Sequence, residues 1–263
     1  MNPIRTIIIK EWEDVRRNKL VFSVVIGVPL LMLAIPVIML AIMGRVPVSQ
    51  GDFEELGRML DNPIFAGLLP AEMMQSVMAS NFIVLFLMMP LMVPVTIAAY
   101  SIVGEKVSRS LEPLLATPIT TTQLLLGKGL AAALPGVAMA WFSYGLFLVF
   151  ARFLAVSDRV LYIFLNPMWL VAMLVLTPLL TIMAVNVGII VSSRTSDPRA
   201  AEQLGSLIIL PLMVLLIGPM TGFIMLNATT FWIASAIAAV ADVGLMYLGV
   251  ALFQRETILT RWK

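Results

Sequence analysis

Six long apolar runs constrain this chain more than any other feature of its sequence. They cover roughly residues 20–43, 79–103, 124–150, 167–193, 203–226 and 231–253. A hydrocarbon core of about 30 Å needs about 20 helical residues to cross it, so each run is long enough to span a bilayer. Charged residues make up only 12% of the chain, against about 25% in an ordinary soluble domain. We therefore expect an all-α polytopic membrane protein with a single transmembrane domain, residues 1–263.

The residue types that are missing exclude several kinds of chemistry. The chain has neither cysteine nor histidine, so disulfides, Cys/His zinc sites and Ser-His or Cys-His catalytic pairs are excluded. Its formal charge of +2 gives no reason to expect nucleic-acid binding. We expect no catalytic residue, no metal site and no enzymatic activity on this chain.

The basic residues are distributed unevenly between the two sides of the predicted membrane domain. Twelve lie before the first run, between the second and third, between the fourth and fifth, and after the sixth, and Lys128 in the first turns of the third run makes thirteen on that side. Only Arg45, Arg58, Arg152 and Arg159 lie on the opposite side. Lysine and arginine accumulate in cytoplasmic segments of membrane proteins. The asymmetry predicts that both termini and residues 104–123 are cytoplasmic, and that residues 44–78 and 151–166 face outside.

Residues 1–19 are predicted to form an amphipathic interfacial helix ahead of the first span. At 100° per residue, Ile4, Ile7, Ile8, Trp12 and Val15 share one side. A basic helix of this kind lies in the headgroup plane of the membrane. Glu11 falls within the apolar side, which leaves two interpretations: its carboxylate reaches the edge of the helix, or it has a buried partner on another element.

Polar and helix-breaking residues inside the spans are few. Asp242 is the only charged side chain near the middle of a span, where an aspartate costs about 2.5–3.5 kcal/mol to insert. It either lines a transport pathway or makes a buried structural hydrogen bond, with Asn186, Thr181 or Tyr247 as the expected partners. Eight prolines also lie within spans, where neighbouring helices and hydroxyl groups can bond to the carbonyls they leave free; they indicate kinked packing or moving hinges.

The connection between the second and third runs is the longest segment on the predicted cytoplasmic side. It contains Leu111, Leu114 and Leu115, whose spacing suits a short helix docking on a surface, and Thr117-Pro118 ends that helix. Nearby, Gly127-Lys128 is followed by Gly129 and lacks the remaining residues of a phosphate-binding loop. We therefore do not expect this chain to bind ATP itself.

The same connection resembles the signature of the ABC-2 type membrane permeases. The residues that match that pattern are Gly104, Glu105, Lys106, Leu111, Glu112, Leu114, Leu115, Pro118, Ile119, Leu126, Gly127 and Lys128. Lys10-Glu11 followed by Arg16-Arg17 is similar to the N-terminal interfacial helix of that family, and six spans agree with its architecture.

The resemblance implies the permease subunit of an ABC exporter in the plasma (cytoplasmic) membrane of a prokaryote. ATP and Mg²⁺ would be bound by a separate ATPase subunit, and a second permease subunit would complete a homodimer or heterodimer. In that family the cytoplasmic loop is a coupling helix seated on the ATPase. The resemblance therefore assigns coupling to Glu11, Glu105, Lys106, Leu111, Glu112, Leu114, Leu115 and Pro118.

One alternative function belongs to a different class. An ion-coupled secondary carrier would use intramembrane ionisable residues, and Asp242, with Asn186 as a further pathway residue, is the candidate. The sequence does not identify the transported molecule, although the apolar spans slightly favour an amphipathic or lipid-like one.

The predicted orientation can be tested on the cysteine-free chain. Single cysteines introduced at Ser108 and Ser49 should react differently with a membrane-impermeant thiol reagent on intact cells. We expect labelling at position 49 and none at position 108 until the membrane is opened. Labelling of position 108 from outside would show that the orientation is wrong.

Overall fold

The protein is a bundle of helices with six candidate membrane spans. The computed structural model describes residues 3–45, 67–107, 120–221 and 223–252. Its candidate spans are Lys19–Met43, Pro70–Val107, Thr122–Leu154, Asp158–Arg194, Pro198–Pro219 and Ala228–Gly249. Every regular element in these residues is helical. The predicted fold class, an all-α polytopic membrane protein with six spans, is confirmed.

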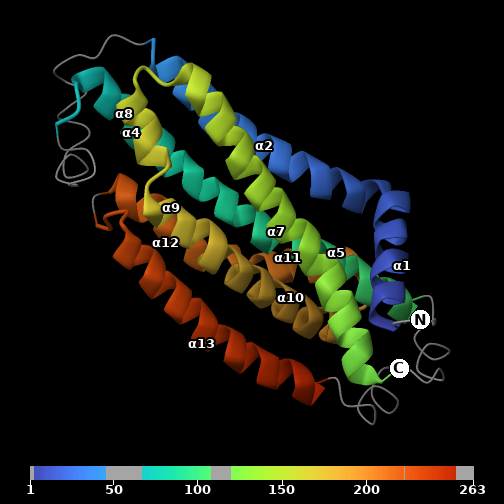
Figure 1. The fold of residues 1–263 in the computed structure, drawn as a ribbon. Coiled ribbons are helices and arrows are strands. Elements are labelled where there is room, and N and C mark those ends of the chain that lie inside the picture. The colour runs from blue at the N-terminus through green and yellow to red at the C-terminus, as the bar shows by residue number, and fades with distance from the viewer. Residues whose placement is uncertain (1–2, 46–66, 108–119, 222, 253–263) are drawn as a thin grey trace.

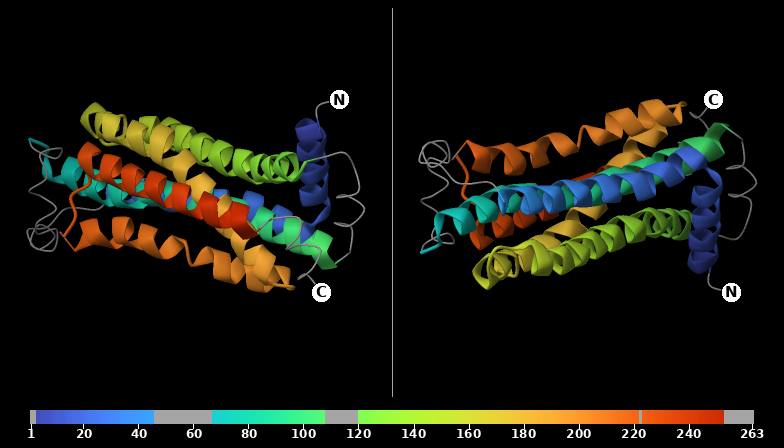
Figure 2. Two further views of the ribbon diagram at one scale, coloured as in Figure 1. Left: turned by 90° about the horizontal axis from the view of Figure 1, so that it is seen from below. Right: turned by 90° about the horizontal axis from the view of Figure 1, so that it is seen from above.

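The first two helices meet at a sharp corner. Helix α1 (Pro3–Arg17) is followed by Asn18, whose backbone is extended. The Asn18 side chain caps the next helix by accepting hydrogen bonds from the amides of Leu20 and Val21. Helix α2 (Lys19–Met43) is the first span. As Figure 2 shows, α1 runs across one end of the bundle, which we call the α1 end, while α2 follows the long axis.

The second span is the central one. It comprises α4 (Pro70–Ile83), the short helix η3 (Val84–Met88) and α5 (Met89–Val107), and it is buried over most of its length. It begins at Pro70, whereas the hydropathy pattern placed its start at residue 79. Gln75 and Ser76 lower the hydropathy of the residues before position 79, yet both are buried between helices.

One of these buried polar residues ties three helices together at the end opposite α1. The Gln75 side-chain amide donates to the carbonyls of Leu40 in α2 and Leu154 in α7, at 2.7 and 3.0 Å, and its oxygen accepts from the amide of Val156 at 2.9 Å. A buried amide satisfied in this way is tolerated within an apolar bundle.

The third span is a single helix and the fourth is interrupted. Helix α7 (Thr121–Leu154) begins at Thr120, which forms a capping box with Gln123. The fourth span contains α8 (Asp158–Phe164), α9 (Pro167–Val171), the π-helical turn η4 (Ala172–Leu176) and α10 (Thr177–Arg194). Helix α8 therefore occupies part of residues 151–166, where the sequence suggested only an outer connection.

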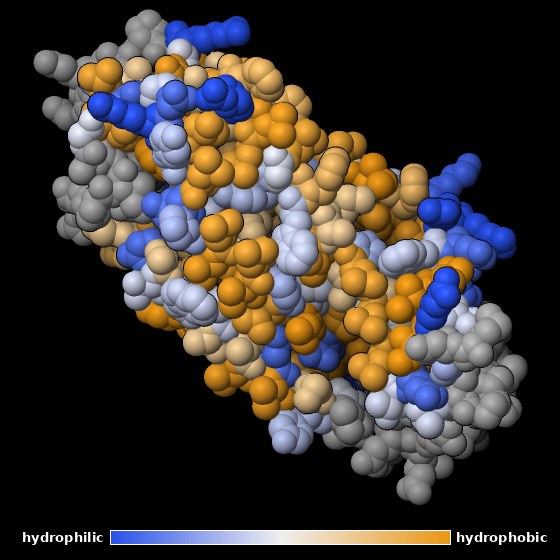
Figure 3. Space-filling model, viewed as in Figure 1, coloured by the Kyte–Doolittle hydropathy of each residue, from blue (hydrophilic) through white to orange (hydrophobic). Residues whose placement is uncertain are grey.

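The last two spans are α11 (Pro198–Ser206) with α12 (Ile209–Met220), and α13 (Ala228–Leu252). Helix α10 packs against both α5 and α13, whereas α12 packs on η3 and α4. Successive spans alternate in direction along the bundle (Figure 1). Hydrophobic side chains cover most of the middle of the visible face, and hydrophilic ones gather towards its two ends (Figure 3).

Candidate functional site

Three helices meet around one buried lysine at the α1 end of the bundle. Lys128 extends from the second turn of α7, and its side chain is 5% exposed. Its ammonium nitrogen lies 2.7 Å from Glu11 Oε1 of α1, 2.9 Å from Glu105 Oε2 of α5, and 2.6 Å from Ser101 Oγ of α5. An ammonium group has three donors and no acceptor, so each of its donors has an oxygen within reach.

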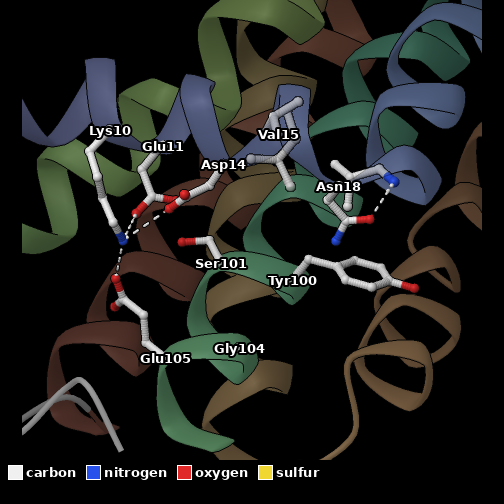
Figure 4. A pocket seen from close by; sticks show the side chains of 11 residues that line it. Lys10, Glu11, Asp14, Val15, Asn18, Tyr100, Ser101, Gly104 and Glu105 are labelled. Carbon is white, nitrogen blue, oxygen red and sulfur yellow. Dashed lines mark hydrogen bonds and ion pairs between the residues drawn. The ribbon is translucent and has the colours of Figure 1, made fainter. Parts of the chain in front are cut away.

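A second lysine extends the cluster towards the surface. Lys10 of α1, whose side chain is about half exposed, donates to Glu105 Oε1 at 2.7 Å. It also lies 3.4 Å from Glu11 and 3.2 Å from Asp14 (Figure 4). Glu105 therefore faces both lysines: its Oε1 accepts from Lys10, and its Oε2 forms an ion pair with Lys128. We call Lys10, Glu11, Ser101, Glu105 and Lys128 the ionic joint.

The charges of the joint perturb one another. Burial opposes the charged form of Glu11, but Lys128 and the surrounding hydrogen bonds outweigh it, so the pKa of this carboxyl is lowered. Burial opposes the charge of Lys10 as well, but the hydrogen bond to Glu105 and the neighbouring carboxylates outweigh it and raise the pKa of the ammonium.

The pH range over which the joint stabilises the folded state follows from the directions of these two pKa shifts. Glu11 stabilises the folded state above the ordinary pKa of glutamate, and that contribution is lost as the pH falls through its lowered pKa. Lys10 stabilises it below the ordinary pKa of lysine, and that contribution is lost as the pH rises through its raised pKa. Both contributions are present at neutral pH.

Two further contacts dock α1 on α7. Proline at position 135 has no amide hydrogen for the carbonyl of Ala131, four residues earlier, and the indole N–H of Trp12 donates to that carbonyl at 3.0 Å. One turn away, a Cβ atom added at Gly127 would come within 2.9 Å of the Ile7 side chain. Glycine at this position permits the close approach of the two helices.

Lys106 belongs to a neighbouring contact. Its ammonium donates to the carbonyls of Ser193 and Thr195, at 3.3 and 3.1 Å, where α10 ends. A cation suits these carbonyls because the end of a helix carries partial negative charge. The last turn of α5 is thus bonded to α1 and α7 through Glu105, and to the end of α10 through Lys106.

A small polar cavity adjoins the joint between α1 and α5. Its volume is about 270 Å³. Figure 4 shows the side chains that line it, including Asp14, Asn18 and Tyr100 beside the joint residues. Its size and polar lining are those of a space that holds water.

The structure brings together part of the residue set that the sequence suggested. Glu11 has a buried partner, the second of its two interpretations, and it meets Glu105 through the lysines. Lys106 lies beside the joint and bonds to α10 instead. Leu111, Glu112, Leu114, Leu115 and Pro118 lie outside the described residues.

Sequence reasoning missed the structural roles of Lys10, Ser101 and Lys128. One signal was available: an acid on the apolar side of an amphipathic helix needs a cation if it is buried, and Lys128 is a lysine within the first turns of an apolar run. Nothing in the sequence shows that these two segments, more than 110 residues apart, lie in contact.

Asp242 is buried at the packed side of α13, with 8% exposure. Neither of its carboxyl oxygens has a hydrogen-bond partner among the described residues. The hydrogen bonds that we predicted between Asp242 and Asn186, Thr181 or Tyr247 are therefore absent from the described residues. Thr181 donates instead to the Thr177 carbonyl of its own helix, Tyr247 is largely exposed, and Asn186 on α10 is only partly buried.

These features define a helical membrane protein whose charged residues hold helices together. The described residues contain no group of three or more acids that could hold a metal ion. A family model described as "ABC-2 family transporter protein" matches residues 68–242, more than half of the chain. The chain belongs to this family and is an ABC transporter permease. No curated protein matches it.

The ionic joint predicts a large effect of removing its central lysine. Lys128→Met leaves Glu11 and Glu105 with less compensation in a buried site, and breaking a buried pair in this way costs about 3–5 kcal/mol. We expect a clear drop in the thermal unfolding midpoint of the purified protein. Asp14→Asn is the matched control, because Asp14 is 56% exposed and an exposed pair contributes about 0–1 kcal/mol. Equal midpoints for the two variants would contradict a stabilising joint.

Proposed function

We propose that this permease is the transmembrane subunit of an ABC exporter driven by a separate ATPase. The observation that supports it best is the position of the ionic joint. The joint links α5 and α7, the two helices that lead into and out of residues 108–119, and fixes both to α1. A partner that displaces this segment would move three helices together.

The coupling is mechanical in this proposal. Glu105 precedes residues 108–119 by three positions and Lys128 follows them by nine, so the joint is close to both ends of the segment. Lys106 adds a bond to the end of α10. Movement of the segment would reach the second, third and fourth spans without any residue of this chain taking part in ATP hydrolysis. ATP and Mg²⁺ would be bound by the partner.

The orientation and the assembly belong to the same proposal. With both termini inside, as the distribution of basic residues indicates, the joint and residues 108–119 face the cytoplasm, where an ATPase has access to ATP. A second permease subunit, identical or different, would pair with this chain in the plasma membrane. The apolar character of the spans favours an amphipathic or lipid-like cargo.

The coupling proposal is tested best outside the joint. Leu115→Asp or Glu112→Lys places an unpaired charge in the proposed docking contact, which costs about 2–5 kcal/mol, and should abolish co-purification with the ATPase while membrane insertion continues. Glu13→Lys, on the exposed side of α1, is the charge-matched control, and this variant should still co-purify with the ATPase. Glu105→Lys is less informative, because Glu105 already pairs with Lys10 and Lys128. Retention of the ATPase by both loop variants would argue against a coupling helix.

One observation favours a second candidate function. The buried Asp242 has no hydrogen-bond partner among the described residues, and such a carboxyl inside a span is a candidate contact for a proton or a cationic cargo. This would make the protein an ion-coupled carrier, or an exporter whose cargo is cationic.

Asp242→Asn separates the two roles, because it keeps the size of the side chain and removes its charge. If Asp242 carries a proton or meets a cation, transport by reconstituted vesicles should be lost, or its pH dependence abolished, while the ATPase still binds. Transport with the wild-type rate and pH profile would leave Asp242 with a structural role only.

A further inference from the structure

A long apolar groove lies between the last two spans. Its volume is about 700 Å³, within the range of sites that hold small organic ligands. Helices α12 and α13 form its sides, and Leu176 of η4 with Leu180 and Met183 of α10 contribute to its floor. Several lining residues are also widely exposed, among them Val214 and Ile237, so the groove is open along one side of the bundle. Asn227 and Thr230 are polar exceptions, and both lie near the start of α13.

The groove has the length of one leaflet. On α13 its lining runs from Thr230, two residues into the candidate span, to Ala241, just past the middle of that span. Eleven residues at 1.5 Å each give about 16 Å. Half of a hydrocarbon core of about 30 Å is about 15 Å. The lining therefore covers about half of the candidate span, from near its start to just past its middle, a length that matches the hydrocarbon half of a bilayer.

An unfilled groove of this kind would be unfavourable in a membrane. Apolar walls without neighbours lose their dispersion contacts, and water finds few polar partners on such a lining. Its occupant must therefore be apolar. A transmembrane helix of a second copy would continue across the whole bilayer, whereas this groove ends near Ala241. A hydrocarbon chain that stops at mid-membrane fits the observed length.

We propose that this groove binds one acyl chain of a membrane phospholipid, from the leaflet in which the connection between α12 and α13 lies. The ester region of the lipid would lie near Asn227 and Thr230, and the end of the chain near Ala241. The lipid chain would then fill the space between two consecutive spans and link α12 to α10 and α13. This proposal does not depend on the direction of transport or on the ATPase.

The test uses a phospholipid that reports where its chain end lies. The full-length protein is reconstituted in phosphatidylethanolamine and phosphatidylglycerol vesicles containing a trace of phosphatidylethanolamine with a diazirine at the end of one acyl chain. After illumination, mass spectrometry locates the adducts. We expect them to concentrate on the deep lining residues, such as Met183, Leu212 and Ala238, above the level on the exposed α2 residues Leu30 and Leu31.

Matched variants decide whether the groove itself is responsible. Ala241→Trp fills its deep end and should remove the enrichment, whereas Ala236→Trp, on the exposed side of the same helix and outside the lining, should keep it. Leu215→Trp and Leu210→Trp form an equivalent pair on α12, in case one substitution prevents folding. Labelling no higher than on α2, or unchanged by the filling variants, would overturn the proposal. A spontaneous disulfide between copies carrying Val214→Cys would overturn it too, because a second protein chain would then occupy the groove.

Discussion

The buried ammonium of Lys128 is the interaction on which the α1 end of this bundle depends. A charge removed from water is costly unless its hydrogen bonds are replaced, and no single helix of this protein supplies three oxygens at the required positions. Glu11 comes from α1, whereas Ser101 and Glu105 come from α5. Because the lysine itself belongs to α7, the requirement to satisfy one cation fixes three helices relative to one another. Two of these helices border the segment that we propose as the contact with the ATPase.

Backbone carbonyls impose a similar requirement deeper in the bundle. A proline within a helix leaves an acceptor without its amide donor, and in a membrane that acceptor must find another donor. Two tryptophans provide it here. The indole N–H of Trp12 donates to the carbonyl of Ala131, four residues before Pro135, and the indole N–H of Trp141 donates to the carbonyl of Met173 at 2.6 Å. In the π-helical turn, the carbonyl of residue i bonds to the amide of residue i+5. The carbonyl of Met173 would therefore bond to residue 178, which is a proline and has no amide hydrogen. The prolines thus create specific contacts between α1 and α7, and between α7 and η4.

The sequence predicted the fold class well because lipid imposes a simple rule on length and polarity. Six apolar runs gave six candidate spans, and the loop motif gave the family. The start of the second span was missed because Gln75 and Ser76 look like loop residues until their burial between helices is known. Glu11 and Glu105 were singled out, but their partner Lys128 was not, since the pairing depends on how α1 crosses the bundle. Residues close in space but distant in sequence leave little trace in one sequence.

The α1 end and the α12–α13 side of this protein are stabilised by opposite means, and the difference bears on movement. At the α1 end, ionic and hydrogen-bonded contacts have short distances and fixed partners, so α1, α5 and α7 must move as a unit or lose several bonds at once. Around the groove, apolar surfaces enclose a space of about 700 Å³. The dispersion contacts that such surfaces make have no directional requirement. On this side, helix α12 can therefore shift against α13 without breaking an ionic contact, although its packing on η3 and α4 must rearrange. If residues 108–119 contact the ATPase and the groove holds a lipid chain, as we propose, force applied at the ionic joint would be expressed as movement of the last spans, because their contacts are the less directional ones.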